Sequence, residues 1–204
     1  MKKRIISLLL IAGVMCTTAV PAFAADADSA RRQPYVDSEN ATLADAPSNN
    51  TMVIMPRTAQ EKSYTIPGGK GSITSNAWRT TGNGTWSGNT LQWNYQVSAV
   101  YSGTYTVSKI RTTWQGSASM RNSASLTLGI SNSGGSAGAS SSWSYVSTVS
   151  KYWENSNGAK NSSYTSNMIA TPGVDYRSGT IAIANEAKVT LSGDPKPYAI
   201  NASA

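Results

Sequence analysis

The sequence of 204 residues contains no histidine, and Cys16 is its only cysteine. Without histidine the chain cannot form a Ser-His-Asp or Cys-His catalytic arrangement, or a zinc site with histidine ligands. Charged residues make up 13% of the chain, which is about half of their share in an average soluble protein. Carboxylates for acid–base chemistry or for calcium are therefore scarce. These absences predict a protein that is not an enzyme, with no catalytic residues, no metal site and no cofactor.

The first residues have the pattern of a secretory signal peptide. Residues 2–4 are all lysine or arginine, Ile5 to Val14 is an apolar segment, and residues 22–24 fit the small-x-small rule for cleavage. No apolar run reaches the roughly 20 residues that a transmembrane helix needs. The sequence therefore predicts a secreted protein whose signal peptide, residues 1–24, is cleaved before Ala25.

Cleavage would remove Cys16, so the mature protein would form no disulfide and would depend on a packed core. A mature chain of this length can bury one core as a single domain. Residues 25–60 contain five acidic residues against three arginines, three of the eight prolines and no strand-like alternation. We expect this segment to be a disordered acidic leader or a propeptide. Arg31-Arg32 and Arg57 are candidate processing points, and a leader that is never processed is the alternative.

Residues 61–204 are predicted to form one folded domain made of strands. From Thr90 to Ala99 every second residue is apolar, the pattern of a strand with one buried and one solvated face. Further predicted strands are 71–80, 104–114, 123–130, 142–149 and 180–191. Turn signals such as Asn157-Gly158 separate these segments, and no proline occurs between Pro67 and Pro172. The sequence therefore predicts an all-β fold, a single antiparallel β-sandwich of jelly-roll or Ig-like type, without disulfides.

Two of these segments carry an irregularity. In residues 104–114 the apolar phase shifts from odd to even positions, which predicts a β-bulge near Ser108-Lys109. In residues 180–191 Asn185 interrupts the apolar face, which predicts a bulge or a division into two short strands.

Tryptophan and tyrosine are the most informative residues for function, because flat aromatic rings stack on sugars, lipid headgroups and partner proteins. Trp93 and Trp114 lie in apolar phases and are predicted core residues. Trp86 lies among turn residues, whereas Tyr152-Trp153 should point one ring to each face of a strand. The predicted ligand-binding residues are Trp86, Trp143, Tyr145, Lys151, Tyr152 and Trp153. The alternative is that all six tryptophans fill the core of a mature chain that has no phenylalanine.

The leading hypothesis is a secreted binding module that recognises a glycan or an anionic cell-envelope polymer through these exposed aromatic residues. Residues 61–204 contain eleven lysines and arginines against five acidic residues, and the basic residues are scattered singly. This distribution favours an anionic wall polymer or a membrane surface over nucleic acid as the electrostatic partner. The oligomeric state is left open by the sequence.

A small pore-forming or membrane-active toxin is the alternative. Residues 117–153 form two Ser/Thr-rich arms of alternating polarity around the glycine-rich tip 133–138, as expected of a hairpin that inserts into a membrane. An ordinary half-buried hairpin has the same alternation. In mature size, basicity and lack of cysteine the chain is similar to the actinoporins, and this resemblance of composition identifies no site residues.

Overall fold

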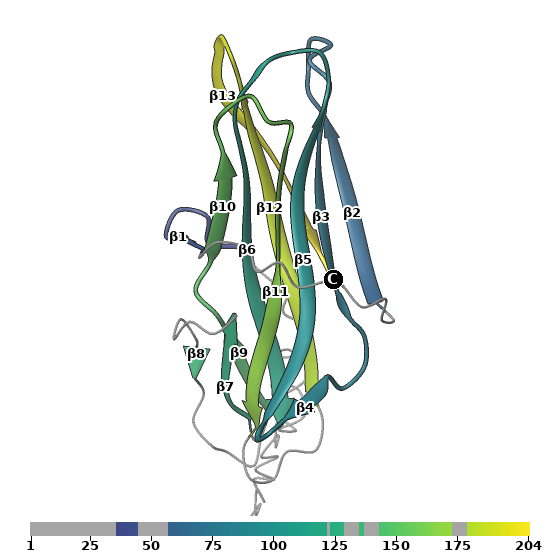
Figure 1. Ribbon diagram of the computed structural model, residues 1–204, viewed down its shortest axis with the longest axis vertical. Helices are drawn as coiled ribbons and strands as arrows, with labels where there is room; N and C mark the ends of the chain where they lie inside the picture. Colours follow the sequence, from purple (N-terminus) through teal and green to yellow (C-terminus); the bar gives the residue numbers. More distant parts are fainter. Residues whose placement is uncertain (1–35, 45–56, 122, 129–134, 137–142, 173–178) are drawn as a thin grey trace, which may run out of the picture.

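The computed structural model describes residues 36–44, 57–121, 123–128, 135–136, 143–172 and 179–204. Over these ranges the protein consists of two β-sheets whose long strands run along the long axis of the molecule (Figure 1). None of the described residues belongs to a helix that is long and apolar enough to span a membrane. The all-β prediction is confirmed. The predicted signal peptide and its cleavage site lie outside the described residues, as does Arg31-Arg32.

Sheet A is built around the long strand β6. Its strands are β1 (Thr42–Leu43), β10 (Lys151–Asn155), β6 (Val107–Arg121), β12 (Gly179–Leu191) and β13 (Asp194–Ser203), in that order, with β9 (Trp143–Ser147) also paired to β6. β12 occupies one edge of β6, so β9 and β10 follow each other along the other edge. β1 is parallel to β10, whereas the other pairs are antiparallel. Sheet A is therefore mixed, and the prediction of a wholly antiparallel fold is wrong at this pair.

Sheet B is antiparallel throughout its described pairs. Its strands are β2 (Arg57–Thr65), β3 (Ser72–Thr80), β5 (Thr90–Ser102), β11 (Asn161–Pro172), β7 (Ser123–Leu128) and β8 (Gly135–Ser136), in that order, with β4 (Thr85–Ser87) paired to β5. The alternation predicted for residues 90–99 is confirmed, since every second residue from Leu91 to Ala99 is buried.

Part of the predicted leader lies against sheet A. The backbone N–H of Thr42 donates to Ser150 and that of Ala44 to Tyr152, each at 2.9 Å, and these bonds add β1 to the exposed edge of β10. Ala44 is buried in the core. At the other end of the leader, β2 already begins at Arg57, before the predicted start of the folded domain at residue 61. The proposed domain boundary itself stays a prediction.

The core lies between the two sheets and contains aromatic residues from both. Trp114 of β6 stacks on Tyr164 of β11 with ring centroids 4.4 Å apart, and its indole N–H donates to the Tyr95 hydroxyl at 3.0 Å. Such a pair combines a large buried area with a satisfied polar group. Trp93 and Trp114 are both buried, as predicted.

The predicted bulge in β6 is confirmed. Thr190 of β12 pairs with Lys109, but the next residue, Leu191, pairs with Val107, so Ser108 has no partner in this ladder. Because of the extra residue, the large buried side chains of β6 change from an odd-numbered position, Val107, to even-numbered positions that begin with Ile110. One inserted residue therefore explains the phase shift seen in the sequence.

The predicted interruption of β12 at Asn185 is wrong. β12 pairs with β6 without a register shift from Gly179 to Thr190, and Asn185 points into the core at 0% exposure. Its side-chain oxygen accepts a hydrogen bond from Thr112 Oγ1 at 2.6 Å, and its amide nitrogen donates to Ser75 Oγ at 3.0 Å. A buried amide costs little free energy when its hydrogen bonds are made, so the strand needs no bulge to remove it from the core.

Asn185 joins strands of both sheets. The side-chain amide nitrogen of Asn185 also lies within hydrogen-bond distance of the backbone carbonyls of Asn76 and Ser98, at 3.0 and 2.9 Å. The backbone carbonyl of Asn185 accepts a hydrogen bond from Ser75 Oγ at 3.0 Å. We call Asn185, Ser75 and Thr112 the interior polar node. On each strand the node residue lies between members of two separate hydrophobic clusters, as Asn185 does between Ile183 and Ala187. The node is therefore the polar layer that divides the core.

Replacement of the node amide should destabilise the protein strongly. We expect Asn185→Ala to lower the free energy of unfolding by about 3 kcal/mol, because it leaves several buried polar groups without a partner. Urea denaturation followed by circular dichroism measures this change. Asn201→Ala is the matched control, since Asn201 is an exposed asparagine on the neighbouring strand β13. An equal loss in the two variants would contradict the role assigned to the node.

Candidate functional site

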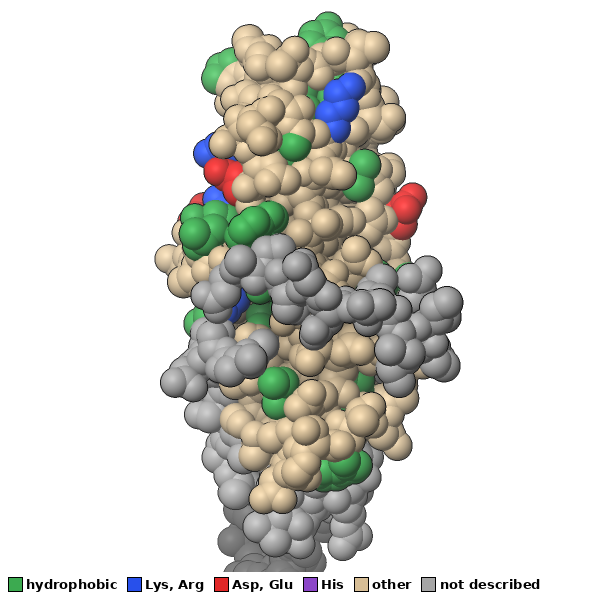
Figure 2. Space-filling view, viewed as in Figure 1, with side chains coloured by type: hydrophobic (Ala, Val, Ile, Leu, Met, Phe, Trp, Pro, Cys, Tyr) green, Lys and Arg blue, Asp and Glu red, His purple; other side chains and the backbone are tan. Residues whose placement is uncertain are grey.

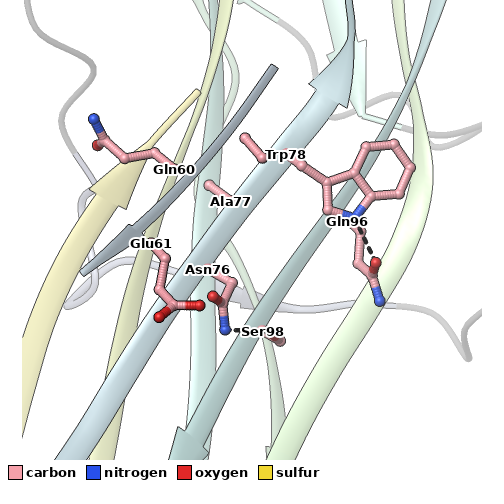
Figure 3. A pocket seen from close by; sticks show the side chains of 8 residues that line it. Gln60, Glu61, Asn76, Ala77, Trp78, Gln96 and Ser98 are labelled. Carbon is pink, nitrogen blue, oxygen red and sulfur yellow. Dashed lines mark hydrogen bonds between the residues drawn. The ribbon is translucent and has the colours of Figure 1, made fainter. Parts of the chain in front are cut away.

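The outer face of sheet B carries a pocket of about 370 Å³. It is lined by Ala59, Gln60, Glu61, Asn76, Ala77, Trp78, Gln96 and Ser98, from strands β2, β3 and β5 (Figure 3). Ala77 and Val97 are buried, so their neighbours Trp78 and Gln96 point away from the core. The pocket therefore combines one indole ring with amide, hydroxyl and carboxylate groups on a regular sheet.

Two side-chain hydrogen bonds orient the groups of this pocket. The indole N–H of Trp78 donates to Gln96 Oε1, and Asn76 Nδ2 donates to Ser98 Oγ at 3.1 Å (Figure 3). Both bonds join residues that are paired across β3 and β5. The Gln96 amide nitrogen can still donate, and the Asn76 amide oxygen can still accept. The pocket can thus hydrogen-bond to a ligand that offers both donors and acceptors, such as hydroxyl groups.

The interior polar node supports the floor of the pocket. Asn185 donates to the backbone carbonyls of Asn76 and Ser98, the two residues whose side chains bond to each other on the opposite side of the sheet. The same stretch of backbone is therefore held from inside by a buried amide and presents ligand-binding groups outside. A site on a backbone fixed in this way is already organised before a ligand arrives.

Three of the sequence-predicted residues lie on β10 but do not form a surface patch. Lys151 pairs with Trp114 and is buried at 7% exposure. Trp153 packs against the core, with its ring 6.3 Å from that of Tyr164. Tyr152 points to the other face, where the Arg111 guanidinium lies 3.6 Å above its ring. The opposite directions predicted for Tyr152 and Trp153 are thus observed, with Trp153 directed inward.

The other two predicted residues of this region lie on β9. Trp143 pairs with Arg121 and Tyr145 with Ser119, and Tyr145 is half-buried. The side chain of Trp143 is outside the described part of the structure. β9 and β10 follow each other along β6, so the structure brings the five predicted residues from 143 to 153 to the same side of β6.

Trp86 lies apart from those five, on sheet B. It is 59% exposed on β4, next to the turn into β5, as its turn-rich surroundings suggested. It pairs with the buried Leu91, so it points to the opposite side of sheet B from Gln96. Gly84, at φ 75°, allows the chain to cross the Trp93 ring, which would contact an added Cβ at 2.6 Å. The six predicted residues therefore do not form one site.

The pocket residues were not among the predicted ligand-binding residues. A signal for them is present in β3, where Trp78 lies in the polar phase of the strand, out of step with the buried Ile73 and Ala77. A large aromatic residue in the polar phase points to an exposed ring on a sheet. The amides opposite it could not be assigned, because the register of β3 against β5 is not visible in the sequence.

Four of the described carboxylates, those of Asp37, Glu154, Glu186 and Asp194, take part in hydrogen bonds or ion pairs. Glu154 pairs with Lys109 at 3.2 Å and Glu186 with Lys188 at 3.1 Å on the outer face of sheet A. Among the residues that the structure describes, no group of three or more His, Cys, Asp or Glu could hold a metal ion. Asp175 lies outside the described ranges.

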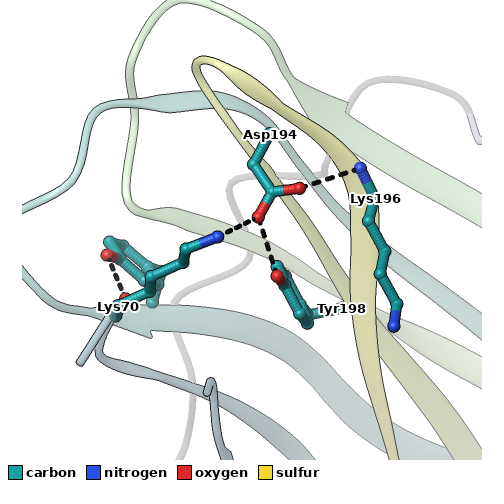
Figure 4. Close-up of polar contacts among 5 residues, drawn as sticks. Lys70, Asp194, Lys196 and Tyr198 are labelled. Carbon is teal, nitrogen blue, oxygen red and sulfur yellow. Dashed lines mark hydrogen bonds and ion pairs between the residues drawn. The ribbon is translucent and has the colours of Figure 1, made fainter. Parts of the chain in front are cut away.

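A second polar cluster closes the far end of the core (Figure 4). The Asp194 carboxylate accepts hydrogen bonds from the Lys70 ammonium, from the Tyr198 hydroxyl at 2.7 Å and from the backbone N–H of Lys196 at 3.2 Å. The ammonium of Lys70, followed by the Tyr198 hydroxyl, lowers the pKa of Asp194 to about 2. The carboxylate in turn raises the pKa of Lys70 and of Tyr198. The cluster joins the turn before β3 to the turn before β13, and we interpret it as structural.

This cluster should make the stability of the fold depend on pH in the acidic range. A lowered pKa means that the Asp194 carboxylate stabilises the fold above its ordinary titration range and loses this effect as the pH falls toward 2. We expect Asp194→Asn to lower the unfolding temperature at pH 7 by about 2–4 °C, and by less at pH 2. Thermal unfolding at both pH values tests this, with Glu61→Gln as a control at an exposed carboxylate. If Asp194→Asn lowers the unfolding temperature equally at pH 7 and pH 2, the stabilising role assigned to the Asp194 carboxylate is wrong.

No family model matches this chain, and no curated protein matches it at a significant level. Its function must therefore be inferred from the geometry of its own residues. The pocket on the outer face of sheet B is the described site that best combines concavity, an aromatic ring and oriented polar groups.

Proposed function

We propose that the protein is a secreted, non-enzymatic binding module for a glycan, and that the pocket on the outer face of sheet B is its binding site. The observation that supports this most is Trp78, a half-buried indole beside oriented amides on a regular sheet. A sugar offers C–H groups on its ring faces and hydroxyl groups at its edges. An indole face and neighbouring amides complement these two features.

The face-to-face packing of the two sheets supports a β-sandwich of jelly-roll or Ig-like type as the finer description of the fold. The long strands of both sheets share one core, and the interior polar node contacts both. A sandwich of this kind leaves the outer face of each sheet available for binding. In this proposal the protein acts outside the cell, and its partner is a cell-envelope or environmental polymer rather than nucleic acid.

The pocket predicts a sharp mutational pattern. Trp78→Ala should weaken glycan binding about tenfold or more, because lost stacking of about 1.4 kcal/mol corresponds to that factor. Gln96→Ala should weaken it several-fold through a lost hydrogen bond. Affinity electrophoresis and calorimetry with a panel of polysaccharides measure both effects, after circular dichroism has confirmed the fold of each variant.

Matched controls separate this site from the aromatic surface predicted from the sequence. Tyr105→Ala removes an aromatic residue that is 42% exposed and does not line the pocket, so it should leave binding unchanged. Trp86→Ala and Tyr152→Ala test the sequence-predicted contacts directly. If these two variants lose binding while Trp78→Ala retains it, the site lies elsewhere and our assignment is wrong.

A membrane-active function is the second candidate, and the pairing of residues 117–147 favours it. Ser117 pairs with Ser147 in sheet A, so the two predicted arms pair with each other through β6 and β9, while Leu126 of the first arm pairs with Gly135 of the predicted tip in sheet B. The buried apolar residues of the first arm are Ala118, Met120, Leu126 and Leu128, and Ser117 and Ser119 between them are buried too. Residues 117–128 have the length of a membrane-spanning strand, and in this structure they are divided between β6 of sheet A and β7 of sheet B. Most of the tip, 133–138, lies outside the described residues.

A disulfide between the hairpin and the body tests this second candidate. Ser125 of β7 pairs with Thr171 of β11, and Ser125→Cys with Thr171→Cys would join the hairpin to sheet B in a mature chain that has no other cysteine. If the hairpin inserts, oxidation should abolish dye release from liposomes and reduction should restore it. Release that is equal in both redox states would exclude insertion of this hairpin.

A further inference from the structure

Charge is distributed unequally between the outer faces of the two sheets. The outer face of sheet A carries the described charged residues Lys109, Arg111, Glu154, Glu186 and Lys188. On the outer face of sheet B, Glu61 is the only charged residue among the described side chains of the strands, and the exposed Lys160 lies at the end of this face, directly before β11, where its ammonium donates to the Gly103 carbonyl at 2.7 Å. In the view of Figure 2, uncharged polar side chains and backbone cover most of the described surface, and the few charged side chains are scattered singly or in small groups. The face that holds the pocket therefore lacks the excess of basic residues that the chain has as a whole.

Strand pairing places the outward side chains of this face in rows of uncharged hydrogen-bonding groups. On β5 the outward positions from Gln92 to Ser98 are three amides and a hydroxyl, and each pairs with an outward residue of β11. The described pairs are Ser98 with Ser163, Gln96 with Thr165, Asn94 with Asn167 and Gln92 with Ile169. All of these residues are at least partly exposed. The rows therefore continue on both strands beyond the pocket around Trp78.

The dimensions of this surface fit a chain rather than a single small molecule. From Val100 to Gln92 the outward positions of β5 cover about 26 Å, at about 3.3 Å per residue. Apolar contacts occur at intervals along it, at Val100, Trp78 and Ile169. Hydroxyl and amide groups between apolar contacts match a polymer whose repeating units each present a ring face and several hydroxyl groups.

We propose that the ligand of this face is a neutral, linear polysaccharide that lies along β5 and β11, with the pocket at Trp78 as its central subsite. This inference rests on the proposed glycan-binding function and makes its ligand specific. An anionic polymer would meet the Glu61 carboxylate beside the pocket, and among the described residues it would meet a cation only at the end of the face, where the Lys160 ammonium already donates to the Gly103 carbonyl, so charge pairing would not favour it along the rows. A neutral polymer needs only the hydrogen-bonding groups and apolar contacts that the rows supply.

Binding of oligosaccharides of increasing length tests the proposal. The probes are neutral β-1,4-glucan, β-1,3-glucan, xylan, mannan and chitin oligosaccharides from the dimer to the hexamer, with polygalacturonate and wall teichoic acid as anionic probes. We expect at least one neutral series to bind more tightly with length, with equal affinity at about 0.15 M and 1 M NaCl, because no ion pairs are screened. Asn94→Ala and Asn167→Ala should weaken hexamer binding three- to tenfold and leave dimer binding unchanged.

The controls distinguish this proposal from the broader function. Asn201→Ala removes an exposed amide from β13 of sheet A and should alter no affinity. If only the anionic polymers bind, with an affinity that decreases as the salt concentration rises, the proposal of a neutral ligand is wrong. The proposed function as a polymer-binding protein would then still hold. If a neutral series binds but neither asparagine variant affects the hexamer, the extended site is wrong. If no polysaccharide of either class binds, the proposed function fails together with this inference.

Discussion

The amide of Asn185 is the contact on which the arrangement of this protein depends. It lies at 0% exposure between the sheets and bonds to side chains of β3 and β6 and to backbone carbonyls of β3 and β5. Because these bonds are directional, they fix the alignment of the two sheets in a way that apolar contacts alone would not. Hydrophobic clusters on both sides of the node supply the non-directional part of the stability.

This interior arrangement has a consequence on the surface. The backbone carbonyls that Asn185 holds belong to Asn76 and Ser98, whose side chains form part of the pocket. Binding groups on loops would pay an ordering cost that this site avoids. The described outer face of sheet B carries mainly uncharged polar groups, with Glu61 as its charged strand residue, whereas ion pairs and a cation–π contact occur on the outer face of sheet A. In our proposal this division makes sheet B the binding face and sheet A the face that the N-terminal segment 36–44 contacts.

Local patterns in the sequence predicted what depends on neighbouring residues. The alternation of β5, the bulge at Ser108 and the burial of Trp93 and Trp114 all follow from which face each residue occupies. Asn185 was misjudged because its hydrogen-bond partners lie 73 to 110 residues away in sequence. The pocket was missed for the same reason, since Trp78 and Gln96 are joined only by the register of β3 against β5. Sequence patterns show which face is buried, but not which residues meet across a sheet.

The most direct test of this account is an NMR titration that follows the side-chain amide groups of asparagine and glutamine during addition of a neutral hexasaccharide that binds. The account predicts that the NH₂ signals of Asn76, Gln96 and Asn94 shift together with the indole signal of Trp78. The Asn185 signal should exchange slowly with solvent before and after binding, because it is buried and hydrogen-bonded. Shifts confined to β9 and β10, or rapid solvent exchange at Asn185, would contradict it.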